Sequence, residues 1–274
     1  MKLTVRFYRS YPMDITAEHP ALGHLGEDEK VMDLDISKTV VAGMHLWNVG
    51  EPGGLDVTPD GPDWPITKLY SYYRDALDLT ANKIRPILSA ARKADMGVVH
   101  VASSRYAHKY PQYANTGEKY GHPDPDNTLP KPDLSWRAEF YEDHYGPNVD
   151  KPMLDIVKNK LRISKVVEPE PDDSVVLSAY QFTRLLSNRH VNTIIYTGYA
   201  TNECLLFAGG GMEQMRNHFR LIAVRDATVA LEHNDTALQQ ANRDAAIRMI
   251  EHSFGYTCTT ADLLQSLGEA AKGT

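Results

Sequence analysis

Short apolar runs rich in β-branched residues alternate with helical patterns over most of this chain of 274 residues. Such runs are typical of strands that are buried on both faces of a parallel sheet. Strands that alternate with helices indicate βαβ units and a mostly parallel sheet, and therefore an α/β protein. We expect strands at residues 39–44, 97–102, 174–177, 193–197 and 220–224.

Two segments depart from this alternation. Residues 1–30 are polar, contain prolines and show no sustained periodicity, so we expect an irregular N-terminal arm that packs on a neighbouring subunit. Residues 31–270 form one domain, interrupted by a proline-rich and aromatic-rich stretch at about residues 103–165. Disordered segments are poor in aromatic residues, and long loops in compact domains usually have a function. We therefore expect an ordered insertion that covers the crevice of its own or a neighbouring subunit.

Two of the predicted helices contain residues that disturb helical geometry. Pro86 lies inside the helical pattern of residues 66–95, so we expect a kink or two consecutive helices there. Gly209, Gly210 and Gly211 follow one another in the helix predicted after residue 201. Each glycine costs a helix about 1 kcal/mol relative to Ala. The triplet predicts a break in this helix, or a close approach of another helix or subunit.

The composition excludes several classes of protein. With 36 acidic and 29 basic side chains, the net charge of −7 argues against a nucleic-acid surface, which needs clustered Lys and Arg. No apolar run approaches the roughly 18 residues of a membrane span, and the chain begins without a charged and then apolar leader. Its two cysteines cannot form a disulfide framework. We expect a cytoplasmic protein whose partner is a small-molecule substrate, with no nucleic acid and no membrane.

One segment combines a cysteine with a strand-to-helix turn. Residues 197–206 read Thr-Gly-Tyr-Ala-Thr-Asn-Glu-Cys-Leu-Leu and follow a predicted strand. They lie at the carboxyl edge of the sheet, where α/β folds place their sites. Thr201 or Asn202 can cap the new helix. Cys204 then lies in the first turn, where the helix dipole and free amides lower the pKa of a thiol.

The same turn offers electrostatic support for a nucleophile. The amides of Tyr199 and Ala200 could hold a developing oxyanion or a substrate carbonyl. The alternative is structural, because cysteine is among the most buried residue types and often packs as a small hydrophobe. Cys258 has no comparable turn beside it, and we expect it to be structural.

The cysteine segment resembles the Gly-x-x-Thr-x-x-Cys signature of the isochorismatase-like cysteine hydrolases. Residues 178–185 are similar to the family's Ser-Ala-Phe-x-x-Thr-x-Leu segment, residues 225–228 and 259–263 continue the match, and residues 39–45 resemble its first strand. The resemblance implies a flavodoxin/Rossmann-like three-layer α/β/α sandwich that forms a homo-oligomer, a dimer or tetramer. It also implies hydrolysis of small amides and ureides, such as nicotinamide, carbamoylated amines, ureidoacrylate or biuret, through a thioester on Cys204. The founding isochorismatases instead cleave a vinyl ether.

The chain departs from the family at two catalytic positions. The family's Asp, which ends the first strand and acts as acid and base, is Gly43 here, and the Gln position is His45. The family's Lys, a few residues before the Ser-Ala-Phe segment, has no counterpart. Glycine cannot transfer a proton, so the family mechanism does not carry over residue by residue.

Two interpretations follow from this departure. In the first, the protein is a cysteine-dependent hydrolase in which His45 exchanges the proton, since an imidazole titrates near neutrality. His45 could instead be a hydrogen-bonded histidine at a strand end. In the second, the protein is a homologue without hydrolytic activity that binds a small ligand or serves in assembly. In either case we expect Trp47, Asn48 and Tyr180 to contact the ligand.

We expect neither a metal nor a cofactor. Histidines lie near carboxylates at residues 120–126, but no Cys or His pair has zinc-like spacing and no His-Glu-x-x-His occurs. Asp56, Asp60 and Asp63 follow the first strand without the two histidines that the resemblance would require for a divalent metal. No Gly-x-Gly-x-x-Gly sequence is present.

Overall fold

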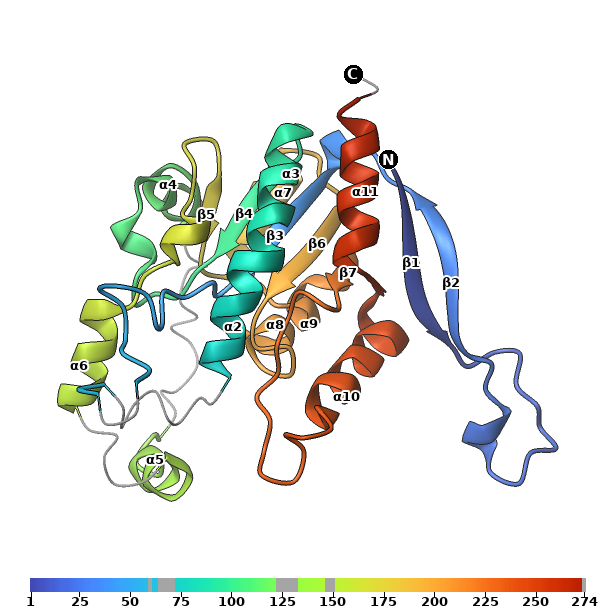
Figure 1. Ribbon diagram of the computed structural model, residues 1–274, viewed down its shortest axis with the longest axis horizontal. Coiled ribbons are helices and arrows are strands. Elements are labelled where there is room, and N and C mark those ends of the chain that lie inside the picture. Colours follow the sequence, from blue (N-terminus) through green and yellow to red (C-terminus); the bar gives the residue numbers. More distant parts are fainter. Residues whose placement is uncertain (59–60, 64–71, 122–132, 146–150, 273–274) are drawn as a thin grey trace.

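An eight-stranded sheet with the order β2-β1-β8-β7-β6-β3-β4-β5 forms the centre of the protein (Figure 1). In this computed structural model, residues 1–58, 61–63, 72–121, 133–145 and 151–272 are described. Neighbouring strands from β8 to β5 are parallel, whereas β1 pairs antiparallel with β2 and β8. The strands are β1 (Lys2–Arg9), β2 (Gly26–Asp33), β3 (Thr39–Met44), β4 (Gly97–Val101), β5 (Ser174–Val176), β6 (Thr193–Gly198), β7 (Arg220–Val224) and β8 (Tyr256–Cys258).

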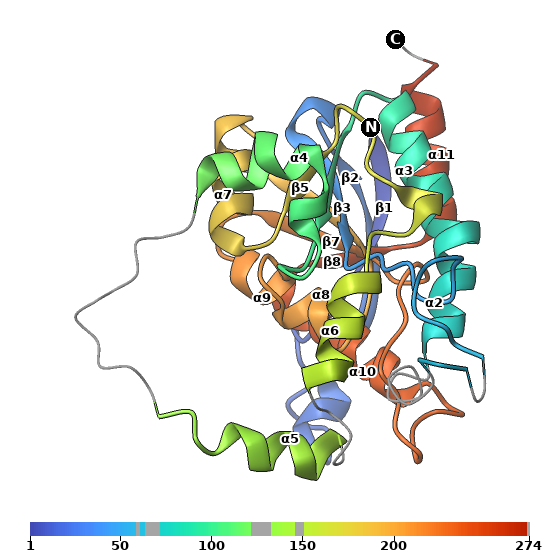
Figure 2. The same cartoon turned by 90° about the vertical axis from the view of Figure 1, so that its left-hand side faces the viewer.

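Helices cover both faces of the sheet. In Figures 1 and 2, α3 and α11 lie on one side of the strands, and α7 and α9 lie on the other. This arrangement confirms the predicted α/β/α sandwich with a mostly parallel sheet. The helices are α2 (Tyr73–Leu79), α3 (Arg85–Lys93), α4 (Pro111–Tyr113), α5 (Arg137–Tyr145), α6 (Lys151–Lys160), α7 (Ala179–Asn188), α8 (Cys204–Phe207), α9 (Met212–Met215), α10 (Ala241–Met249) and α11 (Thr260–Ala270).

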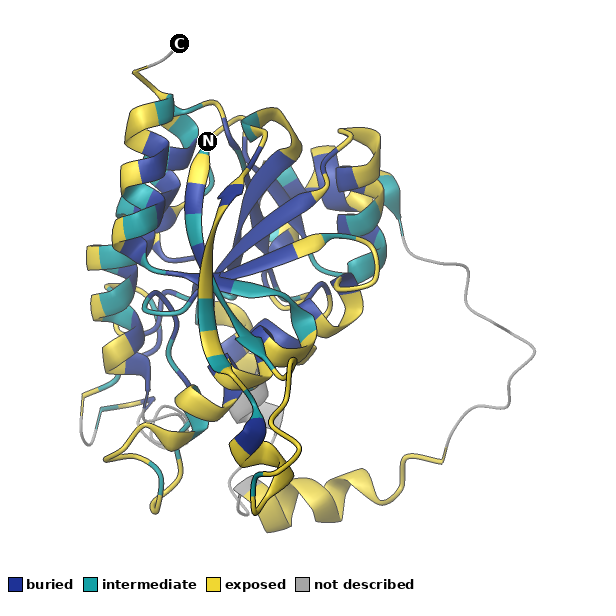
Figure 3. Ribbon diagram, turned by 90° about the vertical axis from the view of Figure 1, so that its right-hand side faces the viewer, coloured by how far each residue is buried: buried dark blue, intermediate teal, exposed yellow. Residues whose placement is uncertain are grey.

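Consecutive residues of the central strands pack into two different hydrophobic clusters. Val41 and Ile195 belong to the cluster under α3 and α11, and Val40 and Ile194 belong to the cluster under α7 to α10. This is the alternation that a pleated strand with two buried faces requires. Figure 3 shows these strands as buried, while the outer hairpin is partly exposed. The five strands expected from the sequence are therefore confirmed, with ends that differ by at most one residue.

The expectation of an irregular arm at residues 1–30 is wrong. Strands β1 and β2 form an antiparallel hairpin, and β1 also pairs with β8, so this segment extends the sheet. Leu3 and Val5 are fully buried and lie on the face that α11 covers. Only two core positions mark β1, which is too few for a periodicity to stand out in the sequence.

The structure confirms that two helical segments are interrupted. A π-helical turn at Thr80–Ile84 separates α2 from α3, and Pro86 is the second residue of α3, directly after this turn. The glycine triplet separates α8 from α9. Gly210 has a φ of +84°, and a Cβ on Gly209 would lie 2.8 Å from the Leu177 carbonyl oxygen. The triplet therefore breaks the helix, and the chain at Gly209 can approach the end of β5 closely.

The insertion at 103–165 has two kinds of surroundings. Its beginning packs into the core, since Tyr106, Tyr110 and Tyr113 are buried. Residues 133–144, which include most of α5, are all exposed, and 55% of the surface of Trp136 is exposed to solvent. Residues 122–132 and 146–150 lie outside the described residues, so whether this segment covers a crevice stays a prediction.

None of the described helices is long and apolar enough to cross a lipid bilayer.

Candidate active site

The segments that follow β3, β4 and β6 meet at the carboxyl edge of the sheet. Met44 and Gly198 are partners in the parallel register of β3 and β6. The Tyr199 amide donates to the Met44 carbonyl oxygen at 3.1 Å, and the His45 amide donates to the Val101 carbonyl oxygen at 3.0 Å. These bonds bring the residues after three strands together in one place.

The turn after β6 depends on a glycine and on two anchoring side chains. Gly198 has a φ of +107°, and a Cβ there would lie 2.2 Å from the Met44 carbonyl oxygen, so only glycine fits. The Thr201 hydroxyl pairs with the Thr228 hydroxyl at 2.8 Å. The Asn202 side chain donates to the Leu231 carbonyl oxygen and accepts from its amide, both at 2.9 Å.

Thr201 and Asn202 therefore tie the turn to the segment after β7. Neither caps the following helix, because α8 begins at Cys204 and its N-cap residue, Glu203, makes no side-chain cap bond. The expectation of a capped helix that begins near Thr201 is wrong for this reason. The peptide bond between Tyr199 and Ala200 is cis.

Cys204 is the first residue of α8 and is partly buried. Burial raises the pKa of its thiol to about 11. The backbone amides of Ala200 and of Cys204 itself oppose this rise in pKa, the Glu203 carboxylate adds to it, and the Arg105 guanidinium opposes it. The expected low pKa is therefore wrong: α8 has only four residues, and desolvation of the thiolate outweighs the donors around it.

His45 follows β3 in a left-handed backbone conformation, with a φ of +46°. Part of the residue remains exposed, but its Nδ1 is buried and has no hydrogen-bond partner among the described residues. Its ring stacks on Trp47 with centroids 5.4 Å apart. Burial first, and then the positive charge of Arg105, lower the pKa of His45 to about 4. The imidazole is therefore neutral at pH 7.

Arg105 is a site residue that the sequence analysis did not identify. It lies in the segment after β4, its side chain is exposed, and its charge acts on both His45 and Cys204. The cysteine and the histidine are thus within electrostatic reach of one guanidinium. Its position a few residues beyond the end of a predicted strand was the available signal, since parallel strands end at the same edge of the sheet.

An apolar side chain fills the space above Gly43, the position at which the motif resemblance implied an acidic residue. A Cβ on Gly43 would lie 2.6 Å from Leu46 Cδ1, and a Cβ on Gly198 would lie 3.0 Å from Leu46 Cδ2. Leu46 is 2% exposed and therefore sits between the ends of β3 and β6. No proton-transfer group comes from position 43 itself: Leu46 fills most of the space, and His100 Nδ1 lies 3.9 Å from the same Cβ position.

Aromatic rings form a wall behind the cysteine turn. Tyr199 is buried, and its hydroxyl pairs with the Thr80 hydroxyl at 3.1 Å. The centroids of the Tyr199 and Trp47 rings are 6.2 Å apart in an edge-to-face arrangement. Trp47 Nε1 donates to the Tyr106 hydroxyl at 3.0 Å. The Tyr199 amide already donates to Met44, so it does not offer a free donor to an oxyanion. The amides of Ala200 and Cys204 remain candidates for that role, since both act to lower the pKa of the Cys204 thiol.

Asn48 and Tyr180 have other partners in the structure. Asn48 is 5% exposed, and its side chain bonds the Lys160 carbonyl oxygen and the Arg162 amide. Tyr180 lies near the beginning of α7, where its hydroxyl accepts a hydrogen bond from Arg184 at 3.2 Å. Both residues follow the carboxyl ends of strands, but their side-chain hydrogen bonds go to Lys160, Arg162 and Arg184 rather than to the cysteine turn.

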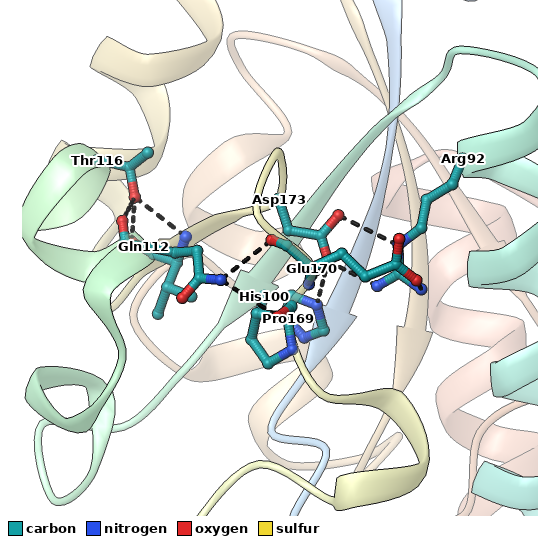
Figure 4. A network of polar contacts seen from close by, with 8 residues as sticks. Arg92, His100, Gln112, Thr116, Pro169, Glu170 and Asp173 are labelled. Carbon is teal, nitrogen blue, oxygen red and sulfur yellow. Dashed lines mark hydrogen bonds and ion pairs between the residues drawn. The ribbon is translucent and has the colours of Figure 1, made fainter.

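A buried polar network includes His100 of β4 (Figure 4). His100 of β4 is the register partner of Gly43, and its Nε2 lies 3.2 Å from Asp173 Oδ2. Asp173 also accepts two hydrogen bonds from Arg92, at 2.6 and 3.2 Å. Burial raises the pKa of this carboxyl, but the bonds from His100 and Arg92 outweigh it, so its pKa is lowered. The network fixes the His100 ring, and sequence periodicity could not distinguish this histidine from a core residue.

Metal ligands do not gather in this region. The described residues contain no group of three or more His, Cys, Asp or Glu side chains arranged to hold a metal ion.

Comparison with known proteins supports the fold. No protein-family model matches the sequence, and no curated protein is similar enough to match. Among solved structures, a cysteine hydrolase from Pseudomonas syringae pv. phaseolicola 1448A is 18% identical with a TM-score of 0.51, over 86% of this chain and 95% of that chain. An isochorismatase family protein from Burkholderia thailandensis is 20% identical with a TM-score of 0.46, over 85% and 96% of the two chains. One from Desulfovibrio vulgaris is 16% identical with a TM-score of 0.49, over 84% and 98%.

The sheet topology defines an α/β/α fold, and this fold is similar to that of the cysteine hydrolase from Pseudomonas syringae. The likeness covers most of both chains, and it agrees with the fold that the motif resemblance implied.

Proposed function

We propose that this protein is a cysteine-dependent hydrolase that cleaves a C–N bond of a small amide or ureide. One observation carries the proposal: the partly buried Cys204 begins α8 directly after the turn at the carboxyl edge of the sheet, where the backbone amides of Ala200 and Cys204 act to lower the pKa of its thiol. A tetrahedral oxyanion that forms on a carbon bonded to this sulfur would lie beside the same donors. The superfamily fold supports this assignment.

The charge states define which proton transfer the site can perform. A thiol with a pKa of about 11 is ionised in roughly one molecule in 10⁴ at pH 7, so the resting enzyme holds Cys204 as a neutral thiol. The neutral His45 has a free lone pair on one ring nitrogen. The proton therefore leaves the sulfur as the carbon–sulfur bond forms, rather than from a preformed ion pair.

The reaction then proceeds in two stages. In acylation, Cys204 attacks the carbonyl carbon, its proton passes to His45, and the imidazolium returns that proton to the departing amine. In deacylation, water attacks the thioester, His45 takes the proton from water, and the proton returns to the thiolate. Arg105 stabilises the negative charge on sulfur when the thiolate leaves. The aromatic wall formed by Trp47, Tyr199 and their neighbours suits a small planar substrate.

A second function is favoured by Leu46. Because its side chain fills the space above Gly43 and desolvation suppresses the thiolate, the same site could bind a small ligand without hydrolysing it. The two functions differ in whether a covalent intermediate forms.

We also propose that the protein is cytoplasmic and forms a homo-oligomer. Exposed apolar side chains on the hairpin loop, such as Tyr11, Ile15 and Leu22, support the homo-oligomer.

The test is a panel of primary amides, N-carbamoyl amines and ureido acids. Ammonia release is measured, and intact-protein mass is recorded after rapid acid quenching. A hydrolase releases ammonia and shows an acyl adduct that is lost in Cys204→Ala. Cys258→Ala is the matched control, because Cys258 is fully buried in β8 and should leave turnover unchanged. Ligand binding that is equal in the wild type and Cys204→Ala, with no adduct and no ammonia, would establish the second function.

A further inference from the structure

A cavity of about 340 Å³ lies between the loop after β3 and the end of the 103–165 insertion. Its volume is within the range of small-molecule sites in proteins. None of the described residues that line it belongs to the Cys204 turn. Its chemistry is therefore considered separately from that of the thiol.

The lining of the cavity carries an excess of positive charge. Lys109, Lys160, Arg162 and Lys165 contribute four basic side chains, against the single carboxylate of Glu168. Lys160 Nζ is paired with Asp63 Oδ2 at 2.5 Å. A second nearby carboxylate, that of Glu51, accepts hydrogen bonds from the Ser164 hydroxyl and the Lys165 amide. Even with both of these acids counted, the basic side chains outnumber the acidic ones.

Two of the basic side chains are held by carbonyl groups only. Lys109 Nζ donates to the carbonyl oxygens of Lys158 at 2.8 Å and Leu161 at 3.3 Å. Arg162 Nη1 donates to those of Asn159 and Leu161, both at 2.7 Å. Within the described part of the chain, neither has a carboxylate partner, and Arg162 Nε and Nη2 have no acceptor. A carbonyl carries only a partial charge, so both cations are positioned but not neutralised.

The segment that carries these cations is fixed to the body of the protein. The Asn48 amide donates to the Arg162 carbonyl oxygen at 3.1 Å, and Asn48 Oδ1 accepts from the Arg162 amide at 2.7 Å. The Tyr110 hydroxyl accepts from the Ile163 amide at 2.8 Å, and the Ser164 amide donates to the Leu46 carbonyl oxygen at 2.8 Å. A positive wall built on such contacts loses little conformational freedom when a ligand binds.

We propose that this cavity binds the oxyanionic group, a phosphate or a carboxylate, of a small molecule through Arg162, Lys109 and Lys165. Arg162 offers a planar fork that matches two oxygens of one anion, and the lysines add charge from neighbouring directions. The site is distinct from the thiol site, and its occupancy does not require Cys204.

The experiment is a calorimetric titration of the full chain at constant ionic strength, with inorganic phosphate, malonate and chloride as separate ligands. We expect saturable binding of phosphate or malonate, and the tighter of the two identifies the group. Arg162→Gln combined with Lys165→Gln should weaken that binding by about tenfold. Arg189→Gln, an exposed arginine at the end of α7, is the matched control and should change it less than twofold. Cys204→Ala should also leave it unchanged.

Two results would overturn the proposal. One is binding of phosphate and malonate no stronger than that of chloride, and the other is equal binding in the wild type and the double variant. Lys165→Gln alone guards against misfolding, because the Lys165 side chain is exposed and makes no hydrogen bond or ion pair within the described residues. It should still weaken binding by about threefold, and its unfolding temperature should equal that of the wild type.

Discussion

The side chain of Leu46 occupies the space above Gly43, with Cδ1 2.6 Å from where a Cβ at residue 43 would lie. The two residues are complementary: the bulk that position 43 lacks is supplied by Leu46. This pair explains how the sheet edge stays packed with a glycine at position 43. It also leaves the proton transfer to groups from other segments.

The Gly43–Leu46 complementarity predicts a non-additive pair of substitutions. Gly43→Ala should destabilise the protein by about 1–3 kcal/mol, because the added methyl overpacks a buried space. In a Leu46→Ala background the same change should cost clearly less, since the clash is gone. Urea unfolding of the four proteins in this double-mutant cycle measures the coupling. Strictly additive costs would contradict the contact.

Cys204 should react slowly at neutral pH and much faster in alkali. With its pKa raised to about 11, the alkylation rate by iodoacetamide should rise by about tenfold per pH unit between pH 7 and 10. Cys258 is fully buried, so its labelling should require unfolding. Peptide mass spectrometry separates the two sites. A rate at Cys204 that is flat above pH 7 would show an activated thiolate and contradict the raised pKa.

Removal of the Arg105 charge should make the Cys204 thiol still harder to ionise. Arg105→Gln deletes the cation that lowers the pKa of Cys204, so alkylation at pH 8 should slow by about threefold. Arg189→Gln is the control for loss of an exposed arginine elsewhere. Equal rates in the wild type and both variants would remove Arg105 from the site.

His45 should make the folded state sensitive to mild acid. Its folded pKa of about 4 lies below the unfolded value of about 6.5, so the unfolded chain binds the proton more readily. The stability is complete above pH 6.5 and is lost as the pH falls towards 4, by about 2–3 kcal/mol in total. Urea unfolding at several pH values measures this slope, and His45→Gln should flatten it. An unchanged slope in the variant would assign the acid sensitivity to other groups.

The buried Asp173 should contribute strongly to stability. Asp173→Ala leaves Arg92 and His100 without their shared acceptor, and we expect a loss of about 3–5 kcal/mol. Glu170 pairs with the same Arg92 at 3.0 Å but is 60% exposed, so Glu170→Gln should cost less than about 1 kcal/mol. Chemical unfolding compares the two. Similar costs would mean that burial of the carboxylate does not decide the effect.

Local patterns in the sequence were sufficient for the framework. The β-branched runs at residues 39–44 and 193–197 predicted central strands, because burial on both faces requires apolar residues at every position. The glycine and cysteine of the turn at residues 197–206 predicted a site at the carboxyl edge, and their spacing predicted the superfamily fold. The hairpin of β1 and β2 was missed, because Leu3 and Val5 alone are core positions of β1, and the contact of β1 with β8 joins residues more than 200 positions apart.

The properties of the site were decided by the tertiary structure. The sequence showed that position 43 is glycine, but only the fold shows that Leu46 fills its space. The helix-dipole argument predicted a lowered pKa for Cys204, whereas burial in the folded protein raises it. Arg105 became part of the site through the parallel register of β3 and β4, which brings the ends of separate strands together. Burial and long-range contacts set these features, and neither is encoded in the spacing of neighbouring residues.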